Sequence, residues 1–355
     1  MARAAGRAAA GARGDAVIPV EESTLLAEVE DRIRQLATPT APHPVQFAAS
    51  HAVHGGKLLR PRLVLAAAGD GGDRAAVVLA AAAIELLHAA LLVHDDVIDD
   101  DDERRGVPSV ARAAREAAAA SGIAPHVAER LGLATAIVAG DALLVRALAA
   151  IARLDVSLDT RVQVVDIIER AMLRAAESEH DDVLLAGREV DEGAIQQVLE
   201  GKTADYSFRA PLELGAVLGG RSPAATTALG EIGLRLGVVY QLRDDVLGVF
   251  GDQQHTGKSV LSDIRAGTPT LLSALARRDP SWQRIAGDYG NPAADARAAE
   301  RVQRVLRESG ALDAVEQRID EGSATLRQLI DAAPIDDALR AELRHILERC
   351  VERDR

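Results

Sequence analysis

Two groups of aspartates are the residues best suited to chemistry in this chain. In the first acidic group, Asp95, Asp96 and Asp99 end a strongly apolar stretch at spacings i, i+1 and i+4. Asp95 and Asp99 therefore share one face of a helix, where two carboxylates repel each other unless a cation lies between them. Mg²⁺ suits this position because it accepts carboxylate oxygens, keeps several waters and recruits substrate phosphates. Acidic runs are usually solvated surface, but unpaired charge is unfavourable on an apolar helix, so we interpret this group as a magnesium site.

The second acidic group repeats this arrangement further along the chain. Asp244 and Asp245 close another apolar helix, Asp252 follows two turns later, and Lys258 lies in the glycine-containing loop beyond. The end of an ordinary helix with a solvated turn has the same pattern. Two such helices in one chain nevertheless favour facing carboxylate clusters that clamp a polyanion through several metal ions and stabilise a leaving group.

Basic residues lie close to the first acidic group in sequence and also near the start of the chain. Arg104 and Arg105 directly follow the first acidic run, where they are well placed to hold a diphosphate through bidentate hydrogen bonds. Lys57 and Arg60 lie three residues apart at the expected start of a helix, and free N–H groups at helix starts also attract anions. A surface pair of basic residues is common, so only the arginine pair points to a diphosphate ligand by itself.

Two further polar positions occur within apolar helices. Gly201-Lys202-Thr203 interrupts one helix and adds a cation and a hydroxyl group. His88 lies seven residues before Asp95, on the same face of its helix. A histidine on an apolar helix is more often a core residue than a ligand, so His88 fits either role.

The elements that must position these groups are helices. From Glu21 onward, stretches of Ala, Leu, Val and Ile carry charges at helical spacing, and the alternation typical of strands is scarce. The chain has 13 Pro and 29 Gly, many of them between these stretches, which indicates about ten or more helices joined by short loops. Since no linker divides the chain, we expect a single all-α domain, a large helical bundle over residues 21–355, after a disordered tail over residues 1–20.

Composition narrows the class of protein. Among 355 residues, 41 basic side chains face 54 acidic ones, and this net charge of −13 argues against nucleic-acid binding while leaving divalent cations as partners. A single cysteine, Cys350, excludes an internal disulfide and any cysteine-based metal site. No uncharged apolar run reaches the roughly 18 residues of a membrane-spanning helix. We therefore expect a soluble, cytoplasmic protein with an aliphatic core and no transmembrane segment.

Taken in order, these motifs resemble those of the trans-isoprenyl diphosphate synthases, the polyprenyl synthetase family, and within it most of all the geranylgeranyl diphosphate synthases. The resemblance covers about residues 45–275. The matching motifs are Gly55-Gly56-Lys57-x-x-Arg60-Pro61, Glu85-x-x-His88, His94-Asp95-Asp96-x-x-Asp99 with Arg104-Arg105-Gly106, Gly140-Asp141, Lys202-Thr203, and Gln241-x-x-Asp244-Asp245.

The resemblance implies an isoprenoid synthase fold with a central apolar cavity, and it implies that the protein forms a homodimer. It also implies head-to-tail condensation of isopentenyl diphosphate with an allylic diphosphate (dimethylallyl, geranyl or farnesyl). In this reaction pyrophosphate leaves, the isopentenyl double bond attacks C1 of the allylic cation, and a proton is lost, so no side-chain nucleophile is required.

The resemblance also implies roles for individual residues. The Mg²⁺ ions on the allylic diphosphate would be held by Asp95, Asp96, Asp99, Asp244 and Asp245. The departing pyrophosphate would be neutralised by Arg104, Lys202 and Lys258, beside Thr203 and Gln241. Isopentenyl diphosphate would be held by Lys57, Arg60, His88 and Arg105. Among these residues, the ones expected to act most directly in catalysis are Asp95, Asp96, Lys202 and Asp244.

Some positions depart from the family pattern. Gly248 stands where many members carry a third aspartate of the second group, and Thr268 stands where a lysine is common. Glu179 and His180 replace a Gln-Tyr-like pair, and Tyr240 replaces a frequent Phe. These departures predict a slower enzyme or an altered substrate preference.

Product length is expected to depend on the helix face that leads to Asp95. Each isoprene unit adds about 5 Å, close to one helical turn, so each turn upstream corresponds to about one more unit. In the family, a bulky aromatic residue four to five positions before the first aspartate keeps products short, and here those positions are Ala90 and Leu91. A C15 stop is therefore not expected. Leu87 and His88, one turn deeper, would close the cavity and favour the C20 product, geranylgeranyl diphosphate.

Two other functions share parts of this pattern. A class I terpene cyclase would share the first acidic group, but it normally carries an Asn-x-x-x-Ser-x-x-x-Glu motif, and the only asparagine here, Asn291, does not begin one. A non-catalytic or regulatory subunit of a two-chain prenyl synthase typically lacks the aspartate motif, which is intact here. Gly248 and Thr268 keep that second alternative open. Residues 280–355 carry no motif that we can interpret.

Overall fold

The computed structural model describes residues 20–186, 188, 190–251 and 260–352, and it is built almost entirely of helices. The first half contains α1 (Val20–Ala37), α2 (Pro44–Ala52), α3 (Leu59–Ala68), α4 (Arg74–Ile98), α5 (Val110–Ala120), α6 (Pro125–Ala152) and α7 (Leu158–Leu185). The second half contains α8 (Glu192–Leu199), the π-helix η1 (Glu200–Arg209), α9 (Ala210–Leu218), α10 (Pro223–Phe250), α12 (Val260–Ala266), α13 (Leu271–Ala276), the 3₁₀ helix η2 (Pro280–Arg284), α14 (Ala296–Glu308), α15 (Ala311–Ala332) and α16 (Asp337–Val351).

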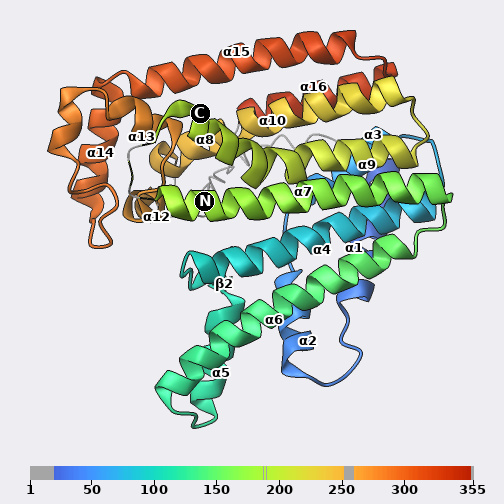
Figure 1. Cartoon of the computed structure of the whole chain (residues 1–355), viewed down its shortest axis with the longest axis horizontal. Coiled ribbons are helices and arrows are strands. Elements are labelled where there is room, and N and C mark those ends of the chain that lie inside the picture. The colour runs from blue at the N-terminus through green and yellow to red at the C-terminus, as the bar shows by residue number, and fades with distance from the viewer. Residues whose placement is uncertain (1–19, 187, 189, 252–259, 353–355) are drawn as a thin grey trace, which may run out of the picture.

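The long helices form a bundle in which most of them run roughly side by side (Figure 1). This confirms the all-α prediction. Lys258 and Asp252 lie outside the described residues, as does the predicted N-terminal tail except for Val20, which begins α1.

Helix α4 runs through the centre of one hydrophobic core and ends at the first acidic group. It begins at the N-cap Asp73, whose carboxylate accepts a 2.9 Å hydrogen bond from the backbone N–H of Ala76. Most of its side chains are small or aliphatic, and the stretch from Ala80 to Ala83 is fully buried. Because alanines let neighbouring helices approach closely, α4 packs extensively against α3, α1 and α6. The packed helix therefore fixes the direction in which its terminal aspartates point.

A two-stranded hairpin follows the first acidic group, where no strand was predicted. Strand β1 (Glu103–Arg104) pairs antiparallel with β2 (Val107–Pro108). The two residues of the turn, Arg105 and Gly106, have φ values of +55° and +76°, as a tight type I′ turn requires. Arg104 contacts the first acidic group and Arg105 contacts the backbone carbonyl of Gly55. How the two arginines bind a diphosphate stays a prediction.

The π-helix η1 continues α8 into α9 and lies between α7 and α10. Its backbone approaches both neighbours closely: a Cβ atom at Gly201 would overlap the side chain of Ser178 on α7, and one at Gly237 on α10 would overlap Ala204. A π-helix has wider turns than an α-helix and is frequent at functional sites. The predicted helix interruption at Gly201-Lys202-Thr203 is thus a change of helix type without a break in the chain of helical turns.

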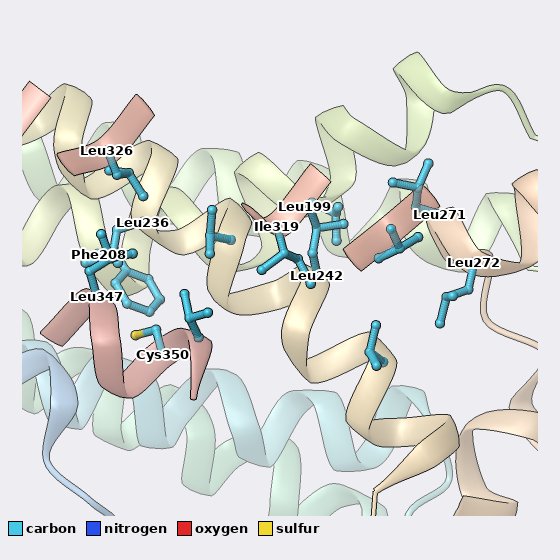
Figure 2. Close-up of a cluster of buried hydrophobic side chains, with 14 of the residues drawn as sticks. Leu199, Phe208, Leu236, Leu242, Leu271, Leu272, Ile319, Leu326, Leu347 and Cys350 are labelled. Carbon is cyan, nitrogen blue, oxygen red and sulfur yellow. The ribbon is translucent and has the colours of Figure 1, made fainter. Parts of the chain in front are cut away.

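A second core joins the C-terminal helices to α10. Figure 2 shows part of it, with Leu236 and Leu242 from α10 beside Ile319 and Leu326 from α15 and Leu347 from α16. Cys350 is buried within this core. The described residues from 280 to 352, in a region that carried no motif, therefore complete the packing around α10, the helix that carries the second acidic group.

Within the part of the chain that the structure describes, two helices are long and apolar enough to cross a membrane by length and composition. In α4, 83% of the most apolar window is buried inside the protein, as expected for a core helix. In α6, only 44% of the window is buried, so much of its apolar surface faces outward. The absence of a transmembrane segment and the cytoplasmic location both stay predictions.

Candidate active site

The first acidic group lies at the end of α4, where the hairpin returns Arg104 to it. Arg104 donates from Nε to Asp96 Oδ1 at 2.6 Å and from Nη2 to Asp95 Oδ2 at 3.3 Å. It also donates a longer hydrogen bond of 3.4 Å to Asp101. Asp96 is buried, whereas Asp99, the C-cap of α4, is exposed at the rim. Arg104 is therefore positioned where the resemblance predicts a cation beside these aspartates.

Lys202 of η1 approaches the same group from the opposite side. Its Nζ atom lies 2.5 Å from Asp182 Oδ2 and 3.0 Å from Glu179 Oε2, both on α7, and 3.8 Å from Asp95 Oδ1. These three carboxylates raise the pKa of Lys202 against the opposing effect of its burial, which is the largest single influence. Lys202 is therefore a permanent cation that links α4, α7 and η1.

Negative charge exceeds positive charge around the first acidic group. Burial raises the pKa of Asp96 and of Glu179 even though Arg104 and Lys202 lie beside them. Partial removal from water, followed by repulsion from Asp95, raises the pKa of Asp99 to about 6. One oxygen of Glu179, Oε1, is buried and accepts no hydrogen bond. Carboxylates whose charge is incompletely compensated are good ligands for a divalent cation.

This donor set fits Mg²⁺ in charge and in chemistry, since all the candidate ligands are carboxylate oxygens. Within the described part of the chain, no three His, Cys, Asp or Glu side chains already converge as a metal site. Arg104 and Lys202 contact the same aspartates instead. The two basic side chains therefore partly balance the charge that a metal would balance.

The second acidic group is connected to η1 through Gln241. Thr203 donates from Oγ1 to Gln241 Oε1 at 2.9 Å, and Gln241 donates from Nε2 to Asp245 Oδ1 at 2.8 Å. Gln241 and Asp245 are four residues apart and so lie on one face of α10, and Asp244 is the preceding residue. Through Lys202 and through the Thr203–Gln241 hydrogen bond, η1 thus connects to both acidic groups. Their shared binding of a diphosphate stays a prediction.

Arg60 and His88 meet around the aromatic ring of Tyr206. Arg60 donates to Ser207 Oγ at 2.7 Å and to Tyr206 Oη at 3.3 Å, and its guanidinium lies 4.9 Å from the centre of the tyrosine ring. The Tyr206 hydroxyl is 3.5 Å from His88 Nδ1. Burial and then the positive charges of Arg60 and Arg105 hold the pKa of His88 well below its usual value. His88 is therefore neutral and offers hydrogen bonds without adding charge.

Lys57 and Arg105 lie at the loop between α2 and α3. Arg105 donates to the backbone carbonyl of Gly55 at 2.5 Å. A Cβ atom at Gly56, whose φ is +129°, would lie 3.1 Å from Arg105 Nη1. Glycine at this position therefore lets the guanidinium pack against the loop. Lys57 is exposed beside it, so this basic loop borders the site without being buried in it.

The predicted chain-length residues belong to the core around α4. Leu87 and Ala90 are fully buried, and Leu91 is partly buried against the same core. Two surface hollows of about 300 Å³ and 470 Å³ lie elsewhere, one against Arg327 and Arg344 and the other against Glu28 and Arg74. Neither contains a residue of the acidic groups, so they are not candidate substrate sites. The central apolar cavity stays a prediction.

Several residues at the site were not predicted from the sequence. Asp182, Tyr206 and Ser207 were missed, and Glu179 was noted only as a departure from the family. The signal for Asp182 was its spacing of three residues from Glu179, which places both carboxylates on one face of α7. Contact of Tyr206 and Ser207 with Arg60 depends on the π-helical turns of η1, which have no reliable sequence signal.

The Gly140-Asp141 motif lies where the end of α4 contacts α6. His94 Nε2 lies 3.1 Å from the backbone carbonyl of Ile137 and 3.5 Å from Asp141 Oδ1. A Cβ atom at Gly140 would overlap the imidazole ring. Because position 140 is glycine, His94, the residue directly before Asp95, can contact α6.

A family model described as polyprenyl synthetase matches residues 43–307. The chain therefore belongs to the polyprenyl synthetase family, which confirms the family and the fold expected from the motifs.

Individual relatives agree with this assignment. A geranylfarnesyl diphosphate synthase of Aeropyrum pernix is 34% identical over 39% of this chain and 44% of its own length. A geranylgeranyl diphosphate synthase of Saccharolobus solfataricus is 34% identical over 58% of this chain and 64% of its own length. The chain thus matches about half of these two relatives. A geranylgeranyl pyrophosphate synthase of Corynebacterium glutamicum, solved with isoprenyl diphosphate and magnesium, aligns over 94% of this chain and 98% of its own, with 30% identity and a TM-score of 0.85.

Proposed function

We propose that this protein is a Mg²⁺-dependent trans-prenyltransferase that condenses isopentenyl diphosphate with an allylic diphosphate. The observation that carries the proposal is the position of η1 between the two acidic groups. Lys202 contacts Asp95, and Thr203 is joined to Asp245 through Gln241. A diphosphate bound between the two groups would therefore be contacted from both sides.

In this proposal the allylic diphosphate is held between the first and second acidic groups. Its metal ligands would be Asp95, Asp96, Asp99, Asp244 and Asp245. Bound Mg²⁺ supplies positive charge to the diphosphate oxygens. Arg104 and Lys202 neutralise the charge that develops on the pyrophosphate as the C1–O bond breaks and the electron pair leaves with oxygen.

Isopentenyl diphosphate would be held by Lys57, Arg60 and Arg105 on the other side of η1. Tyr206 and Ser207 orient the Arg60 guanidinium, and neutral His88 donates or accepts a hydrogen bond there. Binding the two substrates next to each other converts a bimolecular reaction into an effectively unimolecular one. The isopentenyl double bond then attacks C1, and the proton lost from the isopentenyl unit passes to the departing pyrophosphate.

The proposed product is the C20 compound geranylgeranyl diphosphate. Its support is the absence of an aromatic residue at Ala90 and Leu91, together with buried Leu87 one turn deeper along α4. Two of the relatives named above are called geranylgeranyl synthases, and one is called a geranylfarnesyl synthase. A C25 product is therefore the principal competing outcome.

We further propose that the protein acts as a homodimer through α6 and α7. Large apolar side chains are exposed along both helices, including Ile137, Val145 and Leu148 on α6 and Leu158 and Leu173 on α7. Contiguous exposed apolar surface of this kind is typical of an interface with another protein or a membrane. Gel filtration with light scattering distinguishes these possibilities, because a monomer in detergent-free buffer would contradict the dimer.

A product assay tests the proposed function. Purified protein is incubated with Mg²⁺, isopentenyl diphosphate and each allylic primer in turn, and the dephosphorylated products are sized by mass spectrometry. A C20 alcohol supports the proposal in full, and longer products support condensation but not the predicted stop. A cyclic hydrocarbon formed without isopentenyl diphosphate would identify a terpene cyclase. No product with any primer would favour the partner-subunit alternative.

A further inference from the structure

Helix α15 lies beyond the residues matched by the family model and packs along α10, the helix that carries the second acidic group. Figure 1 shows α15 running along one edge of the bundle beside α10 and α16. The sequence offered no interpretation of this region. Its position raises the question of whether α15 affects the site, because any rotation of α10 would move Asp244 and Asp245.

A bidentate ion pair joins the two helices directly next to the acidic group. Arg243 donates from Nη1 to Glu316 Oε1 at 2.7 Å and from Nη2 to Glu316 Oε2 at 2.8 Å. Arg243 is only 2% exposed. Two parallel hydrogen bonds between planar groups restrict orientation as well as distance. The pair therefore fixes the orientation of the Arg243 side chain relative to α15.

This pair contacts α10 on the side that faces away from the site. Successive residues of an α-helix are rotated by about 100°. Gln241 and Asp245 lie on one face and are hydrogen-bonded to each other. Arg243 is midway between them in sequence and therefore projects from roughly the opposite face. Through Arg243, Glu316 thus contacts the helical turn that carries Asp245, on the face opposite to the Asp245 carboxylate.

The surrounding contact between the helices is close and apolar. A Cβ atom at Gly322 would lie 2.9 Å from Val239 Cγ2, so α15 nearly touches α10 at that point. Ile319 is fully buried, and Figure 2 shows it beside Leu242. Apolar contacts impose no hydrogen-bond geometry, whereas a bidentate arginine–carboxylate pair requires the two groups to be coplanar and aligned.

We propose that Glu316 is a positioning residue for the second acidic group. Acting through Arg243, it sets the rotation and axial register of α10 so that Asp244 and Asp245 face η1. This inference rests on the proposed function, since it assigns those aspartates to the allylic diphosphate. It predicts that loss of the pair impairs binding of the allylic diphosphate and leaves binding of isopentenyl diphosphate intact.

The test compares Glu316→Gln with Glu231→Gln. Glu231 forms an ion pair with Arg235 at 2.6 Å on the exposed surface of the same helix, and both partners are about half exposed. Wild-type protein must first form product and bind inorganic pyrophosphate with Mg²⁺ in calorimetry. If it does neither, the proposed function fails before the role of Glu316 is examined.

With active wild-type protein, Glu316→Gln should weaken binding of magnesium pyrophosphate by about tenfold, because small misplacements of contacting groups cost up to ~100-fold in activity. KM for the allylic diphosphate should rise with it, while KM for isopentenyl diphosphate and all values for Glu231→Gln stay within about twofold of wild type. Equal increases in both Michaelis constants, or no change in either, would show that the pair only stabilises the fold.

A second variant keeps the test informative if Glu316→Gln fails to fold. Arg243→Met combined with Glu316→Leu replaces buried Arg243 and its partly exposed partner with apolar side chains. Replacing both partners of an ion pair in this way is often neutral for stability. We expect this double variant to melt close to wild type and still to bind magnesium pyrophosphate more weakly. Wild-type affinity in the folded double variant would overturn the positioning role.

Discussion

Lys202 and Thr203 are adjacent in the chain, yet Lys202 contacts the first acidic group directly and Thr203 is connected to the second through Gln241. Lys202 Nζ lies 3.8 Å from Asp95 at the end of α4, and Thr203 donates to Gln241, which donates to Asp245 on α10. The π-helical geometry of η1 and its close packing against Ser178 and Ala204 place the two residues between α4, α7 and α10. The relative positions of the two acidic groups therefore depend on η1.

The first prediction concerns the carboxylates of the first acidic group. Asp95→Asn with Asp96→Asn should lower kcat/KM with Mg²⁺ at least about a hundredfold, the usual effect of removing a group that stabilises transition-state charge. The fold should persist, because burial already disfavours the charged form of Asp96 and so raises its pKa. Asp102→Asn is the control, since Asp102 belongs to the same acidic run but pairs with Arg115 at 2.6 Å on the surface. Near-normal turnover in the double variant would contradict the metal assignment.

The second prediction concerns the glutamate that departs from the family pattern. Glu179 Oε2 is 3.0 Å from Lys202 Nζ. The glutamate therefore competes with a bound diphosphate for the Lys202 cation, and its negative charge repels the diphosphate. Glu179→Gln should lower KM for the allylic diphosphate about two- to threefold, in line with the ~0.2–1 kcal/mol typical of partly exposed charge pairs. Glu177→Gln, an exposed change on the same helix, should have no effect. A higher KM in Glu179→Gln would mean that the glutamate assists binding.

The third prediction follows from the pKa of Asp99, which is raised from 3.8 to about 6. Between these values the folded protein binds more protons than the unfolded chain, so the contribution of Asp99 to stability falls as pH rises through this window. Asp99→Asn removes that dependence. In a chelating buffer, the variant should be more stable than wild type at pH 7 and equally stable near pH 4, as measured by urea unfolding.

Asp288→Asn provides a contrast of opposite sign for this measurement. Hydrogen bonds from Arg301 hold the pKa of Asp288 below its ordinary value of 3.8. Its contribution to stability is therefore present at neutral pH and lost as pH falls through the lowered pKa. Asp288→Asn should lower stability at pH 7. If both variants shifted stability in the same direction at pH 7, the raised pKa of Asp99 would be wrong.

Features that depend on local sequence could be predicted. Apolar periodicity identified α4 and α10, and both begin at caps of the usual type, Asp73 and Ser222, whose side chains accept hydrogen bonds from the first turn. The aspartates that end these helices lie where helical spacing placed them. Both the all-α fold and the acidic ends of the helices therefore follow from local rules.

Features that depend on contacts between distant segments could not be predicted. The Arg105-Gly106 turn separates two arginines that look equivalent in sequence. The contacts of Lys202 with Glu179 and Asp182 need the π-helical turns of η1, and the pairing of Arg243 with Glu316 needs α15 to pack on α10. In each case tertiary packing brings the partners together, and no fixed spacing in the sequence indicates that they will meet.

The last prediction concerns product length. If the growing prenyl chain extends along the face of α4 that leads to Asp95, Leu87 stands one turn below Leu91 and closes the path after the C20 product. Leu87→Ala should therefore yield C25 or longer products, and Leu91→Phe should shorten them to C15, as sized by mass spectrometry. Leu86→Ala is a matched control, because Leu86 is equally buried on an adjacent face. Both Leu→Ala changes should cost about 2–5 kcal/mol of stability, so a shift in product length confined to Leu87→Ala separates a path-lining role from loss of packing. Identical product distributions in the two variants would place the stop elsewhere in the bundle.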